Sequence, residues 1–160
     1  MPLISLDELA VTLPSAGPLI GLDLGTRTIG IAVSDRLRKV ASARTVLRRI
    51  RFQQDARALL ELATQEAAAG IVIGLPLNMD GSEGPRAQAT RAFARNLAKL
   101  TDIPLIFWDE RLSTVAVERM LIDSDTSRAR RAELVDKLAA AWILQGALDR
   151  LARFAASPGR

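Results

Sequence analysis

The sequence predicts an α/β domain built on a mixed five-stranded sheet with helices on both faces. Three strand-like apolar segments come first, and helical and strand-like segments then alternate. Strands joined by short turns favour antiparallel hairpins, whereas strands separated by helices favour parallel pairing. The length of 160 residues fits one such domain. We place it at residues 18–155 and interpret residues 1–17 as an N-terminal extension.

The hydrophobic pattern gives the order of the elements. Strands are expected at 18–24, 28–34, 40–46, 71–75 and 103–108. The fourth of these, IVIGL, is apolar throughout, which is typical of a central parallel strand. Ser5 and Glu8 suggest a capping box for a short first helix. Further helices are expected at 52–69, where Gly70 ends the helix, and at 85–100, 113–122 and 132–154.

The composition excludes several kinds of chemistry. The chain has no His, Cys or Tyr, and its formal net charge is +4. Histidine-assisted and thiolate nucleophiles, ordinary zinc sites and phosphotyrosyl intermediates are therefore absent. Any catalysis must rely on carboxylates, hydroxyls, Lys or Arg, in combination with a hard metal that prefers oxygen ligands.

Carboxylates at three places could supply those ligands. Asp23 interrupts an apolar strand, where a charged side chain is costly unless it is paired or bound to metal. Asp109 and Glu110 end the last strand, and alternation allows only one of them to face the same side as Asp23. The pattern leaves open which one does so. Asp136 lies near the start of the final helix, where its alternative role is to stabilise the helix dipole.

If these carboxylates converge, they form an oxygen-only site for Mg²⁺ or Mn²⁺. Such ions activate water and orient a phosphodiester without help from histidine. The number of ions is not determined by the sequence. The reaction that we expect is hydrolysis of a nucleic-acid backbone.

Basic residues supply candidate contacts to such a backbone. Seven of them and no acidic residue lie between Arg36 and Arg51, so we expect a concentrated basic patch, although a solvated hairpin is an equal alternative. The loops at 25–28 and 78–84 follow strands and are expected to border the site. The predicted nucleic-acid contacts are Arg27, Arg44, Arg48, Arg49, Arg86 and Arg111.

Four motifs in the chain resemble those of the YqgF/RuvX family. They are GLDLGTRTIGIAVSD (21–35), GLPLNMDGSEGPRA (74–87), DERLST (109–114) and VDKLAA (135–140). The resemblance covers residues 19 to about 151 and implies an RNase H-like fold. It also implies a metal-dependent cytoplasmic nuclease that matures the 5′ end of 16S rRNA, with Asp23, Glu110 and Asp136 as catalytic and metal-binding residues. One departure concerns the end of the fourth strand, where RNase H-like enzymes usually carry an acid and this chain has Gly74-Leu75-Pro76.

Other functions remain open at this point. The family's relation to RuvC implies a Holliday junction resolvase acting on branched DNA as one alternative. A non-catalytic RNA- or ribosome-binding module is another. The LIGLDLGTRT segment also resembles the phosphate loop of actin-like ATP-binding proteins, but those clamp nucleotide between two such domains. The chain start lacks a signal peptide pattern and no apolar run could span a bilayer, so we expect a cytoplasmic protein with no membrane contact.

Overall fold

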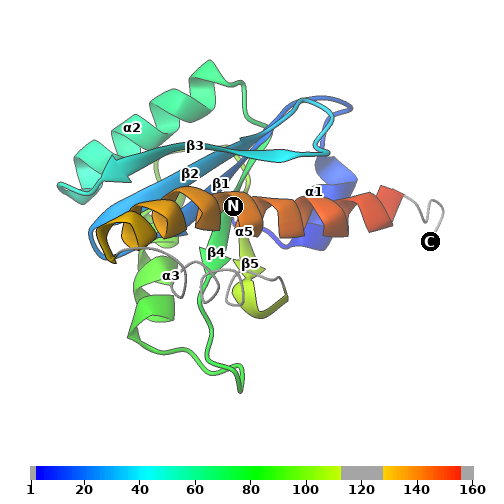
Figure 1. The fold of residues 1–160 in the computed structure, drawn as a ribbon. Helices are drawn as coiled ribbons and strands as arrows, with labels where there is room; N and C mark the ends of the chain where they lie inside the picture. The colour runs from blue at the N-terminus through cyan, green and yellow to red at the C-terminus, as the bar shows by residue number, and fades with distance from the viewer. Residues whose placement is uncertain (1–2, 113–127, 156–160) are drawn as a thin grey trace.

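The computed structural model describes residues 3–112 and 128–155. Within the last helix it describes the backbone throughout and the side chains of residue 135 and residues 138–154. The helix expected at 113–122 lies outside the described residues. The fold is an α/β sandwich around one mixed sheet, as the sequence predicts (Figure 1).

The sheet contains five strands in the order β3-β2-β1-β4-β5. The first three pair antiparallel, and β1, β4 and β5 are parallel to one another. The carboxyl ends of the three parallel strands therefore meet at one edge, which is the place where ligands bind in sheets of this kind. The strands are β1 (Leu19–Leu24), β2 (Thr28–Ser34), β3 (Ala41–Arg48), β4 (Gly70–Leu75) and β5 (Leu105–Asp109).

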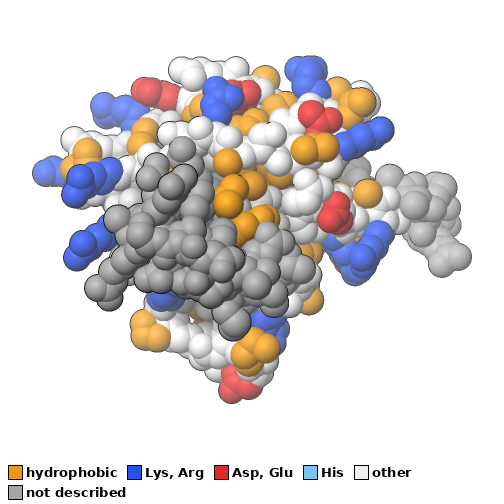
Figure 2. Space-filling model, viewed as in Figure 1, with side chains coloured by type: hydrophobic (Ala, Val, Ile, Leu, Met, Phe, Trp, Pro, Cys, Tyr) orange, Lys and Arg blue, Asp and Glu red, His pale blue; other side chains and the backbone are white. Residues whose placement is uncertain are grey.

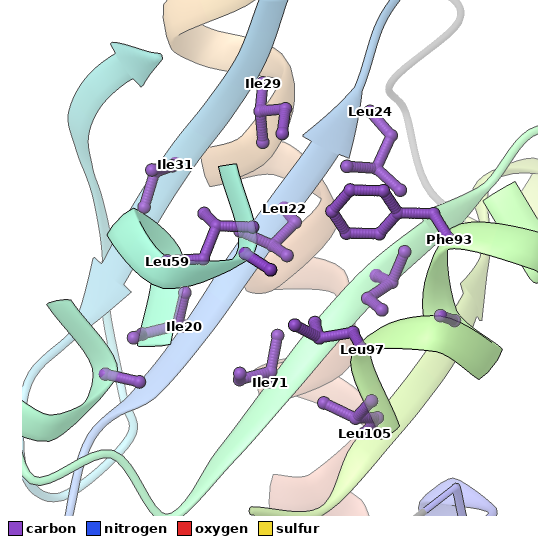
Figure 3. Close-up of a cluster of buried hydrophobic side chains, with 14 of the residues drawn as sticks. Ile20, Leu22, Leu24, Ile29, Ile31, Leu59, Ile71, Phe93, Leu97 and Leu105 are labelled. Carbon is purple, nitrogen blue, oxygen red and sulfur yellow. The ribbon is translucent and has the colours of Figure 1, made fainter. Parts of the chain in front are cut away.

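Two helices, α2 (Phe52–Gln65) and α3 (Pro85–Ala98), cover one face of the sheet. Alternate strand residues such as Leu22 and Leu24 point toward them and pack against Leu59, Phe93 and Leu97 (Figure 3). This cluster is the larger of the two cores, and it fixes which residues of each strand face the other way.

The opposite face is covered by α5 (Arg128–Ala155), with α1 (Leu6–Thr12) beside it. In Figure 1 the orange-to-red helix α5 crosses in front of the sheet. Gly21 allows this close approach, because a Cβ there would lie 2.7 Å from Cβ of Leu144 and 2.9 Å from O of Ala140. A short 3-10 helix, η1 (Glu110–Leu112), follows β5 directly.

The N-terminal segment packs against the domain. Ser5 caps α1 by accepting a hydrogen bond from N–H of Glu8 at 3.1 Å, as the capping box predicts. Leu3 forms a parallel bridge with Leu105, and the N–H of Ile4 donates to the Leu105 carbonyl. The segment therefore covers the start of the edge strand β5.

The predicted end of α2 is wrong. The helix ends at Gln65, and Gly70 is the first residue of β4. The termination uses Ala67, which has a left-handed φ of 52°. Its N–H bonds to O of Thr64, and the next N–H bonds to O of Ala63, which is the Schellman pattern. Glycine usually takes this position, so its absence hid the helix end from the sequence pattern.

Candidate active site

Asp23 lies near the carboxyl end of β1 and faces α5. Its side chain is on the same side of the strand as the Gly21 position that touches α5, because the two residues are two apart. The residue is only 8% exposed. The strand therefore holds a carboxylate inside the fold at the edge where the three parallel strands end.

Asp109 and Glu110 have separate roles at the end of β5. The Asp109 carboxylate accepts hydrogen bonds from Nη2 of Arg111 at 2.7 Å and from Nε at 3.1 Å, and also from the Arg111 N–H at 2.9 Å. The Arg111 side chain, helped by the Arg111 backbone N–H, holds the pKa of Asp109 below its usual range. Asp109 is thus engaged in a local ion pair.

Glu110 lies on the same face of the sheet as Asp23, the face that α5 covers. Its Oε1 lies 3.1 Å from the point that a Cβ on Gly74 would take, and the same point is in contact with Ile143 of α5. Of the two acids whose facing the sequence left open, Glu110 is therefore the one on the α5 side.

Gly74 lies between the two carboxylates. In the parallel pairing of β1 with β4, Leu22 is opposite Ile73, so Asp23 and Gly74 follow on neighbouring strands. Gly74 is itself paired with Trp108 on β5, two residues before Glu110. Neighbouring strands are about 4.8 Å apart. The bare backbone at Gly74 is what lets the Glu110 carboxylate lean over β4 toward β1.

This arrangement explains the departure at the end of the fourth strand. Gly74 carries no acidic side chain, and the carboxylate of Glu110, the residue after the adjacent strand β5, lies above it. Sequence reasoning noted the glycine but not its function. A signal was present, because glycine inside an apolar strand indicates a close approach by another group.

Asp136 is deeper in its helix than the sequence suggested. Helix α5 begins at Arg128, four residues before the predicted start, so Asp136 lies in its third turn. The helix-dipole role is therefore wrong, since that effect is confined to the first turn. The Asp136 side chain lies outside the described residues. Among the side chains that the structure describes, no three His, Cys, Asp or Glu residues form a group that could hold a metal.

The loop after β4 is an ordered turn beside η1. Asp80 accepts from the Ser82 N–H and hydroxyl at 2.9 and 2.6 Å, and Gly81 has a φ of 88°. These bonds, from the Ser82 hydroxyl first, lower the pKa of Asp80. Nη1 of Arg111 donates to the Met79 carbonyl at 3.3 Å. The Arg111 side chain therefore anchors this loop to η1, next to Glu110.

The seven basic residues between 36 and 51 do not form one patch. Strand β3 separates them, so that Arg36, Arg38 and Lys39 are at one end of the sheet and Arg48 is at the other, about 23 Å away along the strand. Arg38 donates to the Gly17 and Pro14 carbonyls and thus holds the N-terminal segment. Figure 2 shows Lys and Arg side chains spread around the margin of this face rather than gathered.

The predicted nucleic-acid contacts differ in solvent exposure and in whether they already bond to other groups of the chain. Arg27 and Arg48 are exposed at the edge that holds Asp23. Arg44 pairs with Glu66 at 2.7 Å, on the side of α2. Arg49 donates to the carbonyl of Gly25 in the β1–β2 turn, and Arg86 donates to the carbonyl of Leu24 at the end of β1. Three predicted contacts, Arg27, Arg48 and Arg86, are exposed at the edge near Asp23.

Comparison with known families matches residues 17–150 to the model of the RuvX family, described as Holliday junction resolvase. In the described residues, no helix is long and apolar enough to cross a membrane.

Two relatives match almost the whole chain. A protein of Paracoccus denitrificans is 63% identical over 92% of this chain and 93% of its own length. A protein of Chelativorans sp. is 58% identical over 99% of both. Each is named "Putative pre-16S rRNA nuclease".

Solved structures show the same fold at low sequence identity. RuvC of Thermus thermophilus, in a complex with a Holliday junction substrate, superposes with a TM-score of 0.53. The match covers 85% of this chain and 96% of that one at 14% identity. The architecture is therefore the RNase H-like fold of the RuvC resolvases.

Proposed function

The chain belongs to the RuvX family, and we propose that it is a metal-dependent nuclease that hydrolyses phosphodiester bonds with Asp23, Glu110 and Asp136. The observation that supports the proposal is that Asp23 of β1 and Glu110, just after β5, lie on the same face of the sheet, with Gly74 of the intervening strand β4 between them. Asp136 is assigned to the same group from the family motif at 135–140 and from its position in the helix that covers this face.

The donor set fits a hard divalent cation, Mg²⁺ or Mn²⁺. Both carboxylates offer oxygen ligands, and Gly74 places no side chain between them. When bound, such an ion supplies polarisation of a phosphoryl oxygen and activation of water.

The chain's own residues orient these partners. Asp23 is fixed by its strand and is almost fully buried, so its carboxylate has little freedom to turn away from the site. Glu110 is held over Gly74 by the start of η1, and the adjacent Asp109–Arg111 pair fixes that turn. A pre-oriented carboxylate pair avoids the ordering cost that flexible ligands would add at each turnover.

The substrate that we propose is precursor 16S rRNA, met on the maturing ribosome in the cytoplasm. The names of the relatives support this choice. Branched DNA is the second candidate, which the family description favours. In either case Arg27 and Arg48, exposed at the site edge, would attract the phosphate backbone rather than read bases.

Cleavage assays with matched carboxylate variants test this function. Purified protein with Mn²⁺ or Mg²⁺ is incubated with labelled precursor rRNA and with a four-way DNA junction. We expect cleavage of at least one substrate, and a loss of about hundredfold or more in Asp23→Asn and Glu110→Gln. Asp102→Asn, which removes an exposed acid distant from the site, is the control for contaminating nucleases. Equal cleavage by all four proteins would exclude this site.

A further inference from the structure

A small pocket lies on the other side of the same sheet edge. Its volume is about 60 Å³, and it is formed between the β1–β2 turn and α3. Leu24, which lines it, belongs to the core under α2 and α3, whereas the preceding Asp23 faces α5. The pocket and the carboxylate pair are therefore on opposite faces of β1, at consecutive residues.

Two arginines and two threonines line this pocket. Arg49 Nη1 donates to the Gly25 carbonyl at 2.6 Å, and Arg86 Nη2 donates to the Leu24 carbonyl at 3.4 Å. Thr26 and the buried Thr90 also line it. Each guanidinium carries five N–H donors, so one carbonyl bond leaves most of them for a ligand.

The charge around the pocket is positive. Asp55 is the acid beside it, with Oδ2 at 4.0 Å from Nε of Arg49, and it is 3% exposed. Its Oδ1 accepts from the N–H of Ile50, which fixes its place. No ion pair within the described part of the chain includes Arg86. Two cations against one anion leave a charge that one phosphodiester would balance.

Arg49 is already held in position. Its guanidinium carbon lies 5.5 Å from the centre of the Phe93 ring, and Phe93 in turn packs edge-on against Phe52 at 5.2 Å. An arginine fixed by stacking, a carbonyl and a buried acid loses little freedom when it binds an anion. At about 60 Å³ the pocket is too small for a nucleobase, so the ligand that its two arginines favour is a small anionic group.

We propose that this pocket, lined by Thr26, Arg49, Arg86 and Thr90, binds one backbone phosphate of the nucleic-acid strand whose neighbouring phosphodiester reaches Asp23 and Glu110. The proposal rests on the proposed nuclease function. The strand would cross the carboxyl edge of the sheet from the α5 side to the α3 side. The pocket would then set the register of the strand relative to the carboxylates.

Binding measurements without cleavage test the pocket. The full chain carrying Asp23→Asn is titrated, in the absence of divalent metal, with inorganic phosphate and with short oligonucleotides. In NMR spectra we expect phosphate to shift the amide signals of Thr26 and Thr90. We also expect Arg86→Gln to weaken oligonucleotide binding about tenfold and to lower the salt slope by about one. Arg95→Gln, the same charge change on the same helix, should leave both within about twofold.

The outcomes separate the pocket from the nuclease function. Equal effects of Arg86→Gln and Arg95→Gln, or no shift at Thr26 and Thr90, would overturn the pocket even if the wild-type protein cleaves RNA. If the protein binds phosphate but cleaves neither substrate, the pocket proposal would stand and the proposed nuclease function would be rejected. Oligonucleotides with and without a 5′-phosphate should bind equally. A strict need for the 5′-phosphate would overturn the assignment to a backbone diester.

Discussion

Gly74 gives the most direct test of how the candidate site is built. Substitution by alanine places a Cβ 3.1 Å from Oε1 of Glu110 and in overlap with Cδ1 of Ile143. Ile143 is fully buried, so it cannot swing out to solvent. Overpacking of this kind costs about 1–3 kcal/mol, which corresponds to a fall of about 2–12 °C in the melting temperature.

The same substitution should reduce cleavage for a separate reason. The Glu110 carboxylate must shift by a few tenths of an ångström from its place over β4. We expect a loss of about tenfold in kcat/KM, because catalytic groups tolerate little displacement. The assay is cleavage of the labelled substrate at a temperature where circular dichroism shows that both proteins are folded.

A double variant separates stability from catalysis. Ile143→Val removes the Cδ1 that the new methyl group would strike, at a cost of about 1 kcal/mol alone. The Gly74→Ala/Ile143→Val protein should be more stable than the sum of the single effects, while its cleavage stays low. If cleavage returned together with stability, or if Gly74→Ala were fully active, the idea that Gly74 makes room for Glu110 would be refuted.

Three further outcomes can be measured. Ala67→Gly should raise stability by about 0.5–1 kcal/mol in thermal or urea unfolding, because Ala67 has a φ of 52° that glycine adopts without strain; an unchanged or lower stability would count against it. The backbone N–H of Val40, first among several donors, lowers the pKa of Asp35, so the charge on Asp35 stabilises the fold above about pH 3.9, the pKa of an unfolded Asp. The Asp35→Asn protein should therefore have a lower melting temperature than wild type at pH 7, and the difference should narrow as the pH falls below about 3.9. Arg27→Gln and Arg48→Gln should each lower the salt slope of nucleic-acid binding by about one, and an unchanged slope would place the backbone elsewhere.

Apolar periodicity predicted most of the elements. The predicted strand 28–34 matches β2 residue for residue, and 71–75 differs from β4 by one residue. The end of α2 and the start of α5 were predicted wrongly, because no glycine or change of hydrophobic pattern marks them. Ala67 ends α2 in a conformation that glycine usually takes, and α5 begins four residues earlier than its apolar stretch suggested.

The candidate site shows the same division. The sequence singled out Asp23 because an acid inside an apolar strand is costly to bury without a reason. It could not choose between Asp109 and Glu110, because both flanking faces are apolar. In the structure Asp109 pairs with Arg111, and Glu110 lies in the space over Gly74, on the same face as Asp23. The basic residues at 36–51 were likewise expected to form a patch because they are close in sequence, whereas in the structure strand β3 places them at opposite ends of the sheet.

By itself, then, the sequence determined the element order, the fold class, the absence of histidine and thiol chemistry, and the acids worth examining. These are properties of local periodicity and residue type, which act over a few neighbours along the chain. The tertiary structure alone decided that Glu110 leans across β4 toward Asp23, that Arg111 holds a loop, and that Arg49 and Arg86 face one pocket. Those relations depend on strand register and on which face α5 covers, and both are set by packing between segments far apart in sequence.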